Sequence, residues 1–329
     1  MSLFYERARV NALSRPRVAE LERPAPQRTR EGRSILMRRF HPRPWRMLTV
    51  TSNKGGVGKT TLALNLAVYL RALRAELPIL ALSLDDQSTL DRVFSFEGDA
   101  PKETVATALR AGNFASAIRT GRFGVRWVPS DPDVAALKRE IDDPLQLQAA
   151  LDRTGWRGLV VVDTKADLEI LTRNAIAASD LTLVPVTDDA SLREAVKVFE
   201  LLDEWALPRE RARIVLSMVD LRVKFRQGEA RDVLALLLAD IRRRGLPVLE
   251  TFVSASPKVA TLTTNPEGRA LSVLHGAPGS LVHRQMAFVA REVLAILGSP
   301  GADPDAGAAD EASRAATVLP VKRSLLRSA

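Results

Sequence analysis

Short apolar runs alternate with helical patterns along most of this chain. Runs of apolar and β-branched residues predict strands over 47–51, 78–84, 125–129, 159–162, 181–186, 214–219 and 248–252. Apolar residues at helical spacing predict helices over 60–74, 134–140, 191–204, 231–244 and 281–297, and 256–258 reads as a loop. This alternation predicts an α/β fold, a doubly wound, mostly parallel sheet with helices on both faces.

The two ends of the chain lack this pattern. Residues 1–46 hold 12 Lys and Arg against 4 Asp and Glu, and residues 1–45 are rich in proline. We expect a flexible basic extension over 1–45, which is either a tether or an arm that binds a polyanion. The composition after Gly298 turns to Ala, Gly, Pro and Asp, which is typical of disorder. The expected organisation is therefore an extension over 1–45, one domain over 46–298 and a tail over 299–329.

A glycine-rich loop lies between the first strand and the first helix. Glycines in this context let backbone N–H groups turn toward an anion, and the following helix presents the positive end of its dipole. Lys59 would reach the outer phosphates of a nucleotide, and the Thr60 hydroxyl would bind Mg²⁺. Asn53 stands where the usual phosphate loop has its first glycine. The candidate nucleotide-binding residues are Lys54, Gly55, Gly56, Val57, Gly58, Lys59, Thr60 and Thr61.

The sequence KGGVGKTT at 54–61 resembles the deviant Walker A box of the ParA/MinD family of P-loop ATPases, and the resemblance extends over about 47–297. It implies ATP hydrolysis with weak basal activity, with ATP and Mg²⁺ as the nucleotide and its metal. It also implies a homodimer that forms with ATP, in which Lys54 of one subunit contacts the phosphates held by the other. Lys54 and Lys59 are accordingly candidate catalytic residues.

Two acids follow predicted strands. Asp163 ends an apolar run that reads as a central strand, which is the position of a carboxylate that holds Mg²⁺ beside a phosphate loop. Asp85 matches the second aspartate of the family's Asp-x-Asp-Pro-Gln segment, which implies a catalytic role in positioning water near the metal and the γ-phosphate. The metal candidates are therefore Thr60, Asp85 and Asp163.

Both acidic segments depart from the family pattern. Ser83 and Asp86 replace the first aspartate and the proline of the first segment. In the second segment, Lys165 and Ala166 stand where the family has two prolines. These departures lie where the loops that respond to hydrolysis are expected, so the coupling of hydrolysis to dimer opening is expected to differ here.

Composition narrows the class of protein. The chain has 329 residues, no cysteine and a formal net charge of +9. Without cysteine it has no disulfides or iron–sulfur clusters, which excludes the nitrogenase iron protein and the cluster-assembly ATPases that share this loop. With only Tyr5 and Tyr69 it lacks the tyrosine-rich tail of the related kinases. No apolar stretch approaches the roughly 20 residues of a membrane span.

The basic charge outside the extension lies in residues 205–298, which hold 14 Lys and Arg against 8 Asp and Glu. The resemblance implies non-specific DNA binding through such residues in the C-terminal half of the domain. The candidates are Arg222, Lys224, Arg226, Arg242, Arg243, Arg244 and Lys258.

The resemblance implies a cytoplasmic, nucleoid-associated ATPase that partitions or positions a plasmid, chromosome region or protein cluster. Its expected partner is a centromere-binding or cargo-adaptor protein that stimulates hydrolysis. One alternative is a MinD-like ATPase that cycles on membranes. Its basic C-terminal helix would have to form over only about two turns here, after Pro320, so we do not expect membrane binding. The other alternative is a metabolic enzyme that uses the same loop for ligase chemistry.

Overall fold

The structure is a computed structural model that describes residues 43–87, 89–97, 102–220, 224–227, 229–262 and 271–298, with the side chains of 224–233 left out. The predicted extension, apart from residues 43–45, and the predicted tail lie outside this range. Arg222 lies outside it as well. None of the helices within these ranges is long and apolar enough to span a membrane.

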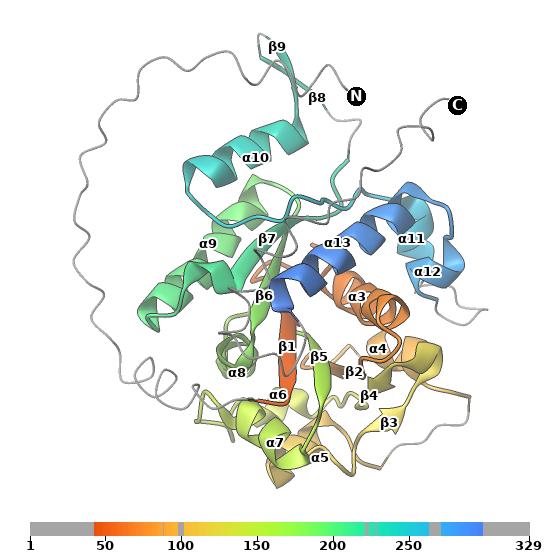
Figure 1. Cartoon of the computed structure of the whole chain (residues 1–329). Coiled ribbons are helices and arrows are strands. Elements are labelled where there is room, and N and C mark those ends of the chain that lie inside the picture. The colour runs from red at the N-terminus through yellow and green to blue at the C-terminus, as the bar shows by residue number, and fades with distance from the viewer. Residues whose placement is uncertain are drawn as a thin grey trace, which may run out of the picture.

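A seven-stranded sheet forms the centre of the domain, with strand order β3-β4-β2-β5-β1-β6-β7 (Figure 1). All neighbouring strands pair in parallel except β3 and β4, so the predicted mostly parallel sheet is confirmed. The strands are β1 (Trp45–Val50), β2 (Ile79–Ser83), β3 (Arg119–Thr120), β4 (Arg126–Trp127), β5 (Gly158–Asp163), β6 (Leu181–Val186) and β7 (Ala212–Leu216). A separate hairpin is formed by β8 (Lys224–Gln227) and β9 (Glu229–Asp232).

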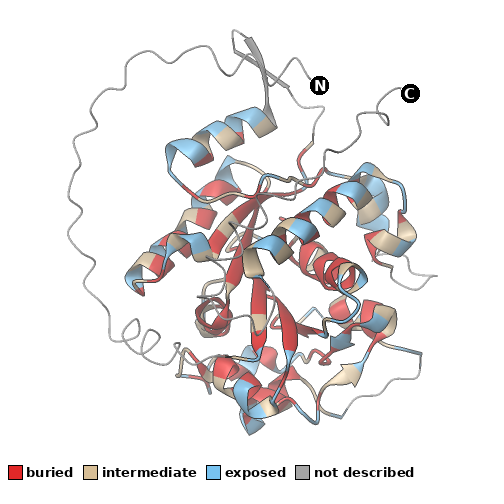
Figure 2. Cartoon of the chain, in the orientation of Figure 1, coloured by how far each residue is buried: buried red, intermediate tan, exposed pale blue. Residues whose placement is uncertain are grey.

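Helices cover both faces of this sheet, and the central strands are buried on both sides (Figure 2). Alternate residues of β5 point into different cores, since Val161 packs with one cluster and Val160 and Val162 with another. One face is covered by α3 (Lys59–Leu73) and α13 (Leu281–Leu297), and the other by α5 (Val105–Ala111) and α7 (Gln146–Thr154). This two-sided burial explains why the central strands are apolar throughout.

The remaining helices complete the two layers. A third cluster packs α9 (Asp189–Glu204) and α10 (Val233–Arg243) beside β6 and β7. The shorter elements are α4 (Thr89–Phe94), α6 (Val134–Leu137), α8 (Ile170–Ala178), α11 (Pro257–Thr261), α12 (Val273–Gly276), η2 (Arg122–Gly124) and η3 (Arg209–Arg211).

The strand predicted over 248–252 is wrong. This segment makes one isolated bridge, between Ile214 and Val248, and a second bridge, between Val219 and Ser254, follows it. The Glu292 carboxylate of α13 competes with β7 for the N–H groups of this segment. It accepts hydrogen bonds from the N–H groups of Glu250, at 2.8 Å, and Thr251, at 3.2 Å. With these N–H groups bonded to a side chain, the segment cannot continue a regular ladder with β7.

Several other boundaries also differ, two of them in the segment that follows β7. The loop predicted over 256–258 is wrong, because Pro257 and Lys258 begin α11. The Ser256 side chain accepts from the Val259 N–H group and so caps this helix, and proline suits its first position. The helix predicted from residue 231 begins at Val233, because residues 231 and 232 belong to β9.

Candidate nucleotide-binding site

The carboxyl ends of β1, β2 and β5 meet at one edge of the sheet, which is where ligands bind in open α/β folds. The β5 end is tied to β1, because the Thr164 hydroxyl donates to Val50 O at 3.1 Å and to Thr51 Oγ1 at 2.9 Å. It is tied to β2 by the Leu84 N–H group, which donates to Asp163 O at 2.8 Å. The loops that carry the candidate site residues therefore start from rigid neighbouring strands.

The phosphate loop has the backbone that its glycines predict. Gly56 and Gly58 have φ values of 75° and 85°, in the left-handed region that glycine adopts without strain. At Gly58 a side chain would also be crowded, because a Cβ would lie 3.1 Å from Met218 Sδ and 3.3 Å from Ser217 Oγ. Nothing lies within 4 Å of a Cβ at Gly55 or Gly56, so this part of the loop is open to a ligand.

Lys59 is the first residue of α3 and is buried, with 7% of its surface exposed. Its ammonium donates to Lys54 O at 3.1 Å, across the base of the loop. Burial lowers the pKa of Lys59, while the charges of Asp163, Asp85 and Asp167 act in the opposite direction. The cation is therefore held inside the loop, where it can contact a phosphate.

Asp163 ends β5 and is 1% exposed. Neither of its carboxylate oxygens has a hydrogen-bond partner that meets ordinary geometry among the described residues. Burial raises its pKa to about 7, and the nearby Thr60 hydroxyl and Lys59 ammonium act against this rise. An unsatisfied buried carboxylate beside a hydroxyl fits a Mg²⁺ ion, which accepts one or two protein oxygens and completes its shell with water and phosphate. Accordingly, the described residues contain no cluster of three or more acidic, His or Cys ligands that would form a protein-only metal site.

This burial gives a pH prediction for the protein without nucleotide. Because the folded-state pKa of Asp163 is raised above its unfolded value, stability that is present below about pH 4 should be lost as the pH rises through about 7. Asp163→Asn should remove this loss and raise the free energy of unfolding at about pH 8.5 by roughly 2–4 kcal/mol. Urea unfolding at about pH 5.5 and 8.5 measures it, with Asp133→Asn, an exposed carboxyl, as the control. An Asp163→Asn effect that does not change with pH would contradict the prediction.

Asp85 lies in the turn after β2. Its backbone N–H group donates to Ser83 Oγ at 3.2 Å, and its carboxylate accepts from the Gln87 N–H group at 3.3 Å. Ser83, which replaces an acid of the family pattern, thus contributes to the turn that holds Asp85. Burial and the neighbouring Asp86 raise the pKa of Asp85, whereas the Lys165 ammonium lowers the pKa of Asp86 to about 2.

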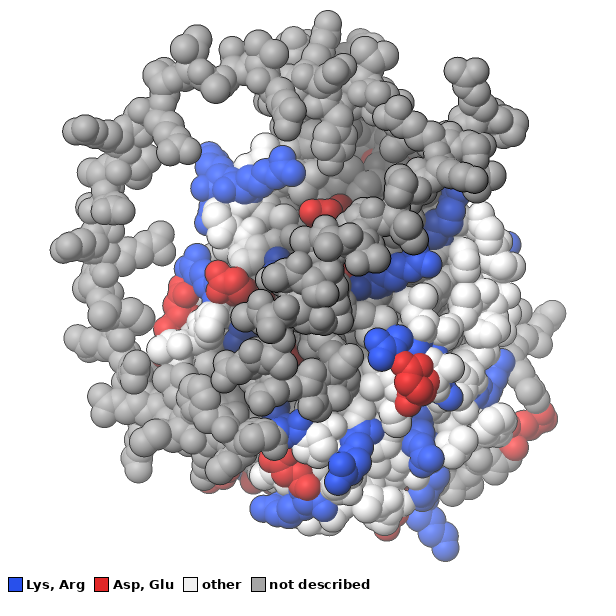
Figure 3. All heavy atoms as spheres, in the orientation of Figure 1, with Lys and Arg blue, Asp and Glu red and all other residues white. Residues whose placement is uncertain are grey.

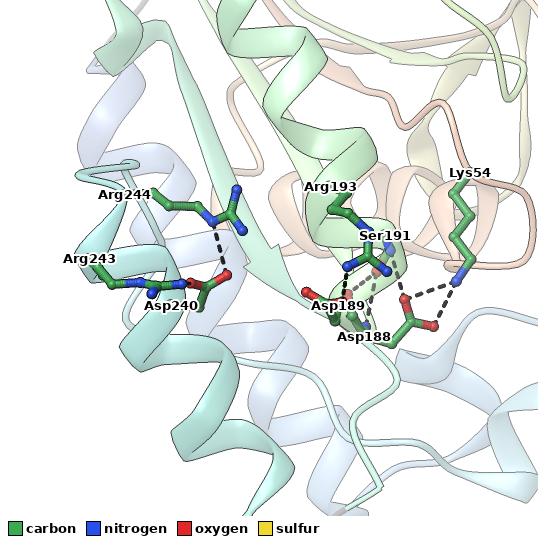
Figure 4. Close-up of polar contacts among 8 residues, drawn as sticks. All are labelled: Lys54, Asp188, Asp189, Ser191, Arg193, Asp240, Arg243 and Arg244. Atoms are coloured by element: carbon green, nitrogen blue, oxygen red, sulfur yellow. Dashed lines mark hydrogen bonds and ion pairs between the residues drawn. The ribbon is translucent and has the colours of Figure 1, made fainter.

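Lys54 extends from the phosphate loop to Asp188 at the start of α9 (Figure 4). Its ammonium lies 2.7 Å and 2.9 Å from the two carboxylate oxygens of Asp188, and its side chain is 33% exposed. Asp188 caps α9 by accepting from the Ser191 N–H group at 2.7 Å. Partial burial raises the pKa of Asp188, but the bonds from Lys54 and Ser191 outweigh it and lower the pKa to about 2. Asn53 is bound to the same helix through Glu194.

A pocket of about 540 Å³ opens beside Asp188, between the start of α9 and α10. Its lining combines apolar and charged side chains, and the charged ones are drawn in Figure 4. The lining residues are Asp188, Asp189, Leu236, Leu237, Asp240, Arg243 and Arg244. This lining contains neither Lys59 nor Asp163, so the pocket is distinct from the phosphate site.

Among the candidate DNA-binding residues whose side chains the structure describes, Lys258 lies apart from the three arginines at the end of α10. Arg243 and Arg244 both pair with Asp240, which offsets part of their charge, while Arg242 is exposed. Lys258 lies on α11, well apart from α10 (Figure 1). Lys and Arg side chains are spread over several parts of the face in Figure 3, with Asp and Glu between them. Lys224 and Arg226 lie in β8, but their side chains are outside the described residues.

The structure also identifies contacts that the sequence did not predict. Asp188 binds Lys54, Asp167 lies near the Lys59 ammonium, and Lys165 bonds to Asp86 at 2.8 Å. Of these residues, only Asp188 could have been found from the sequence. Aspartate is a common N-cap residue, and Asp188 lies three residues before Ser191 at the start of a predicted helix. All three contacts join segments far apart in the chain, so spacing alone could not reveal them.

Part of the chain is similar in sequence to known proteins. Residues 45–200 match the protein family described as AAA domain (AAA_31). The chain is 28% identical over 206 residues to the chromosome partitioning protein ParA of Caulobacter vibrioides, an alignment that covers 58% of this chain and 76% of that protein.

Solved structures share the fold at low sequence identity. A plasmid partition protein from Borrelia burgdorferi bound to AMPPNP has a TM-score of 0.55 at 16% identity, over 76% of this chain and 97% of that one. Cobyrinic acid a,c-diamide synthase from Mycobacterium smegmatis, with an ATP analog and magnesium bound, has a TM-score of 0.54 at 20% identity, over 66% and 90%. Both of these proteins were solved with an ATP analog.

Proposed function

We propose that this chain is a ParA-like P-loop ATPase that dimerises when it binds ATP, binds DNA without sequence preference and positions a cargo that is released on hydrolysis. Its similarity to a chromosome partitioning protein supports this proposal. Residues 46–298 would form the ATPase domain, flanked by the basic extension over 1–45 and the tail over 299–329. The protein would act in the cytoplasm on the nucleoid. A centromere-binding or cargo-adaptor protein would stimulate hydrolysis, since the relative that it resembles is a chromosome partitioning protein.

The position of Lys54 carries this proposal. The phosphate loop holds two lysines, and only Lys59 is buried inside it. Lys54 extends its ammonium to the surface at the start of α9, where a second molecule can reach it. Its pair with the half-exposed Asp188 is inexpensive to break, because such pairs contribute about 0–1 kcal/mol. Exchange of Asp188 for a phosphate on a second subunit is therefore energetically accessible.

The remaining site residues have separate roles in this proposal. The N–H groups of Gly55 to Thr61 and the Lys59 ammonium would hold the phosphates. Thr60 and Asp163 would hold Mg²⁺, which offsets phosphate charge when it is bound. Asp85, kept in its turn by Ser83 and Gln87, would orient the attacking water. Slow turnover is expected because Asp85 by itself would activate the attacking water only modestly.

DNA binding is expected to be strongly salt-dependent and to respond to Arg242. If the dimer neutralises about six phosphates, the slope of log affinity against log salt should be about −5. Arg242→Ala should weaken ATP-dependent binding by about threefold to tenfold, because this exposed side chain is not offset by Asp240 as Arg243 and Arg244 are. Fluorescence anisotropy of a duplex at several salt concentrations measures both effects.

The control is Arg110→Ala, since Arg110 pairs with Glu140 at 2.8 Å outside the C-terminal segment. A chain that lacks residues 2–42 tests the arm separately, and it keeps Arg43, which bonds to Asp180 at 2.8 Å. This truncated chain should lose only ATP-independent binding. If it loses all binding, or if ATP leaves its affinity unchanged, the nucleoid mechanism is wrong for this protein.

Two other activities can be distinguished from this one. A ligase-type enzyme would turn over ATP only with a small-molecule acid, and the likeness to the diamide synthase shows the fold alone. A membrane-cycling ATPase would sediment with anionic liposomes only when ATP is present. We expect ATP turnover without an added acid, and no ATP-dependent sedimentation.

A further inference from the structure

Two of the residues that replace the family's prolines after β2 and β5 are bonded to each other. Asp86 follows Asp85 after β2, and Lys165 follows Asp163 and Thr164 after β5. The Lys165 ammonium lies 2.8 Å from Asp86 Oδ2. The side chains are 41% and 28% exposed, respectively. Two departures that are 79 residues apart in the sequence thus form one contact beside the nucleotide site.

This contact lies just beyond the end of a strand ladder. β2 and β5 pair up to Ser83 with Asp163, and the last backbone bond runs from the Leu84 N–H group to Asp163 O. Beyond it, the ion pair joins the two outgoing loops. The loop after β5 is fixed a second time by Lys138, which bonds to Asp167 at 2.8 Å. Residues 165–167 of this loop are therefore held at both ends, at Lys165 by Asp86 and at Asp167 by Lys138.

Asp86 is also in contact with the turn that carries Asp85. The Gln87 side-chain amide donates to Asp86 Oδ1 at 3.2 Å, while the Gln87 backbone N–H group donates to Asp85. A shift of Asp86 would therefore disturb the Asp85 turn. Lys165 therefore acts on Asp85 indirectly, through Asp86.

We propose that Asp86 and Lys165 form a clamp between the two loops, and that Lys165 is a positioning residue for Asp85 in hydrolysis. A proline restricts the backbone of its own loop, whereas this ion pair restrains one loop against the other. Because the pair is half-exposed, the restraint is reversible and weakened by salt. This inference rests on the proposed ATPase function, in which Asp85 orients water.

A double-mutant cycle on the full-length protein tests the clamp. Asp86→Asn and Lys165→Met should each lower kcat for ATP about tenfold, since small displacements of a positioned group are costly, and leave KM within about twofold. The double variant should be no slower than either single variant, because both remove the same bond. Lys165→Arg, which keeps the charge, should retain kcat within about twofold. The control is Arg209→Met. It breaks the pair with Asp203 just before β7, at the amino-terminal ends of the strands and so away from the nucleotide site.

Hydrogen–deuterium exchange without nucleotide gives a readout that is independent of activity. Both single variants should speed exchange equally over 84–87 and 164–168, and the control should not. The clamp is wrong if exchange in these segments is unchanged, or if the kcat losses multiply to about a hundredfold in the double variant. It is also wrong if Lys165→Met alone raises KM, which would mean that Lys165 contacts the nucleotide. A wild-type protein that does not turn over ATP would refute the proposed function, while the exchange experiment would still test the clamp.

Discussion

Lys59→Ala should abolish ATP binding, and with it all turnover. The side chain lies buried at the phosphate loop, where the charges of Asp163, Asp85 and Asp167 favour its charged form. Loss of a charge-assisted bond to phosphate in such a site should weaken ATP at least about a hundredfold. Isothermal titration calorimetry with ATP and Mg²⁺ measures the affinity directly.

Lys102→Ala, which removes an exposed lysine, is the matched control for charge. Circular dichroism should show that Lys59→Ala is folded, since it deletes a buried cation that burial already disfavours. ATP affinity at the wild-type level in a folded Lys59→Ala protein would refute the assignment of the phosphate loop.

Lys54→Ala should bind ATP but fail to dimerise. Its ammonium makes no described bond inside its own loop and reaches Asp188 at the surface instead. Asp188→Ser is the matched partner variant, because serine keeps an oxygen that caps α9 while removing the charge. It should dimerise at an equal or lower ATP concentration than the wild type. Sedimentation velocity across an ATP series measures both, and a dimer of Lys54→Ala at wild-type ATP levels would contradict the trans role.

The parts of the site that were predictable from sequence are local ones. Strand, glycine loop and helix follow each other within 45–73, and Asp163 ends an apolar run, so spacing and pattern suffice for both. The bounds of β6 and α13 match the predicted ranges for the same reason. In each case a short window contains the full signal.

The parts that were not predictable depend on partners elsewhere in the chain. The segment over 248–252 looks like a strand until Glu292, on another helix, takes two of its N–H groups. The short helix α8 was not anticipated, since it is buried around most of its circumference and shows no polar face. The pairing of Asp86 with Lys165 follows from the register of β2 and β5, which no local pattern encodes.

The most direct test of ATP-dependent dimerisation is the mass of the full-length Asp85→Ala protein by light scattering, with Mg²⁺, with and without ATP. Because Asp85 is proposed to orient water and not to bind ATP, this variant should form the dimer and hydrolyse too slowly to leave it. The 36.0 kDa chain should therefore double its mass when ATP is added and return to the monomer when ATP is removed by dilution. An unchanged mass in the presence of saturating ATP would contradict the proposed mechanism.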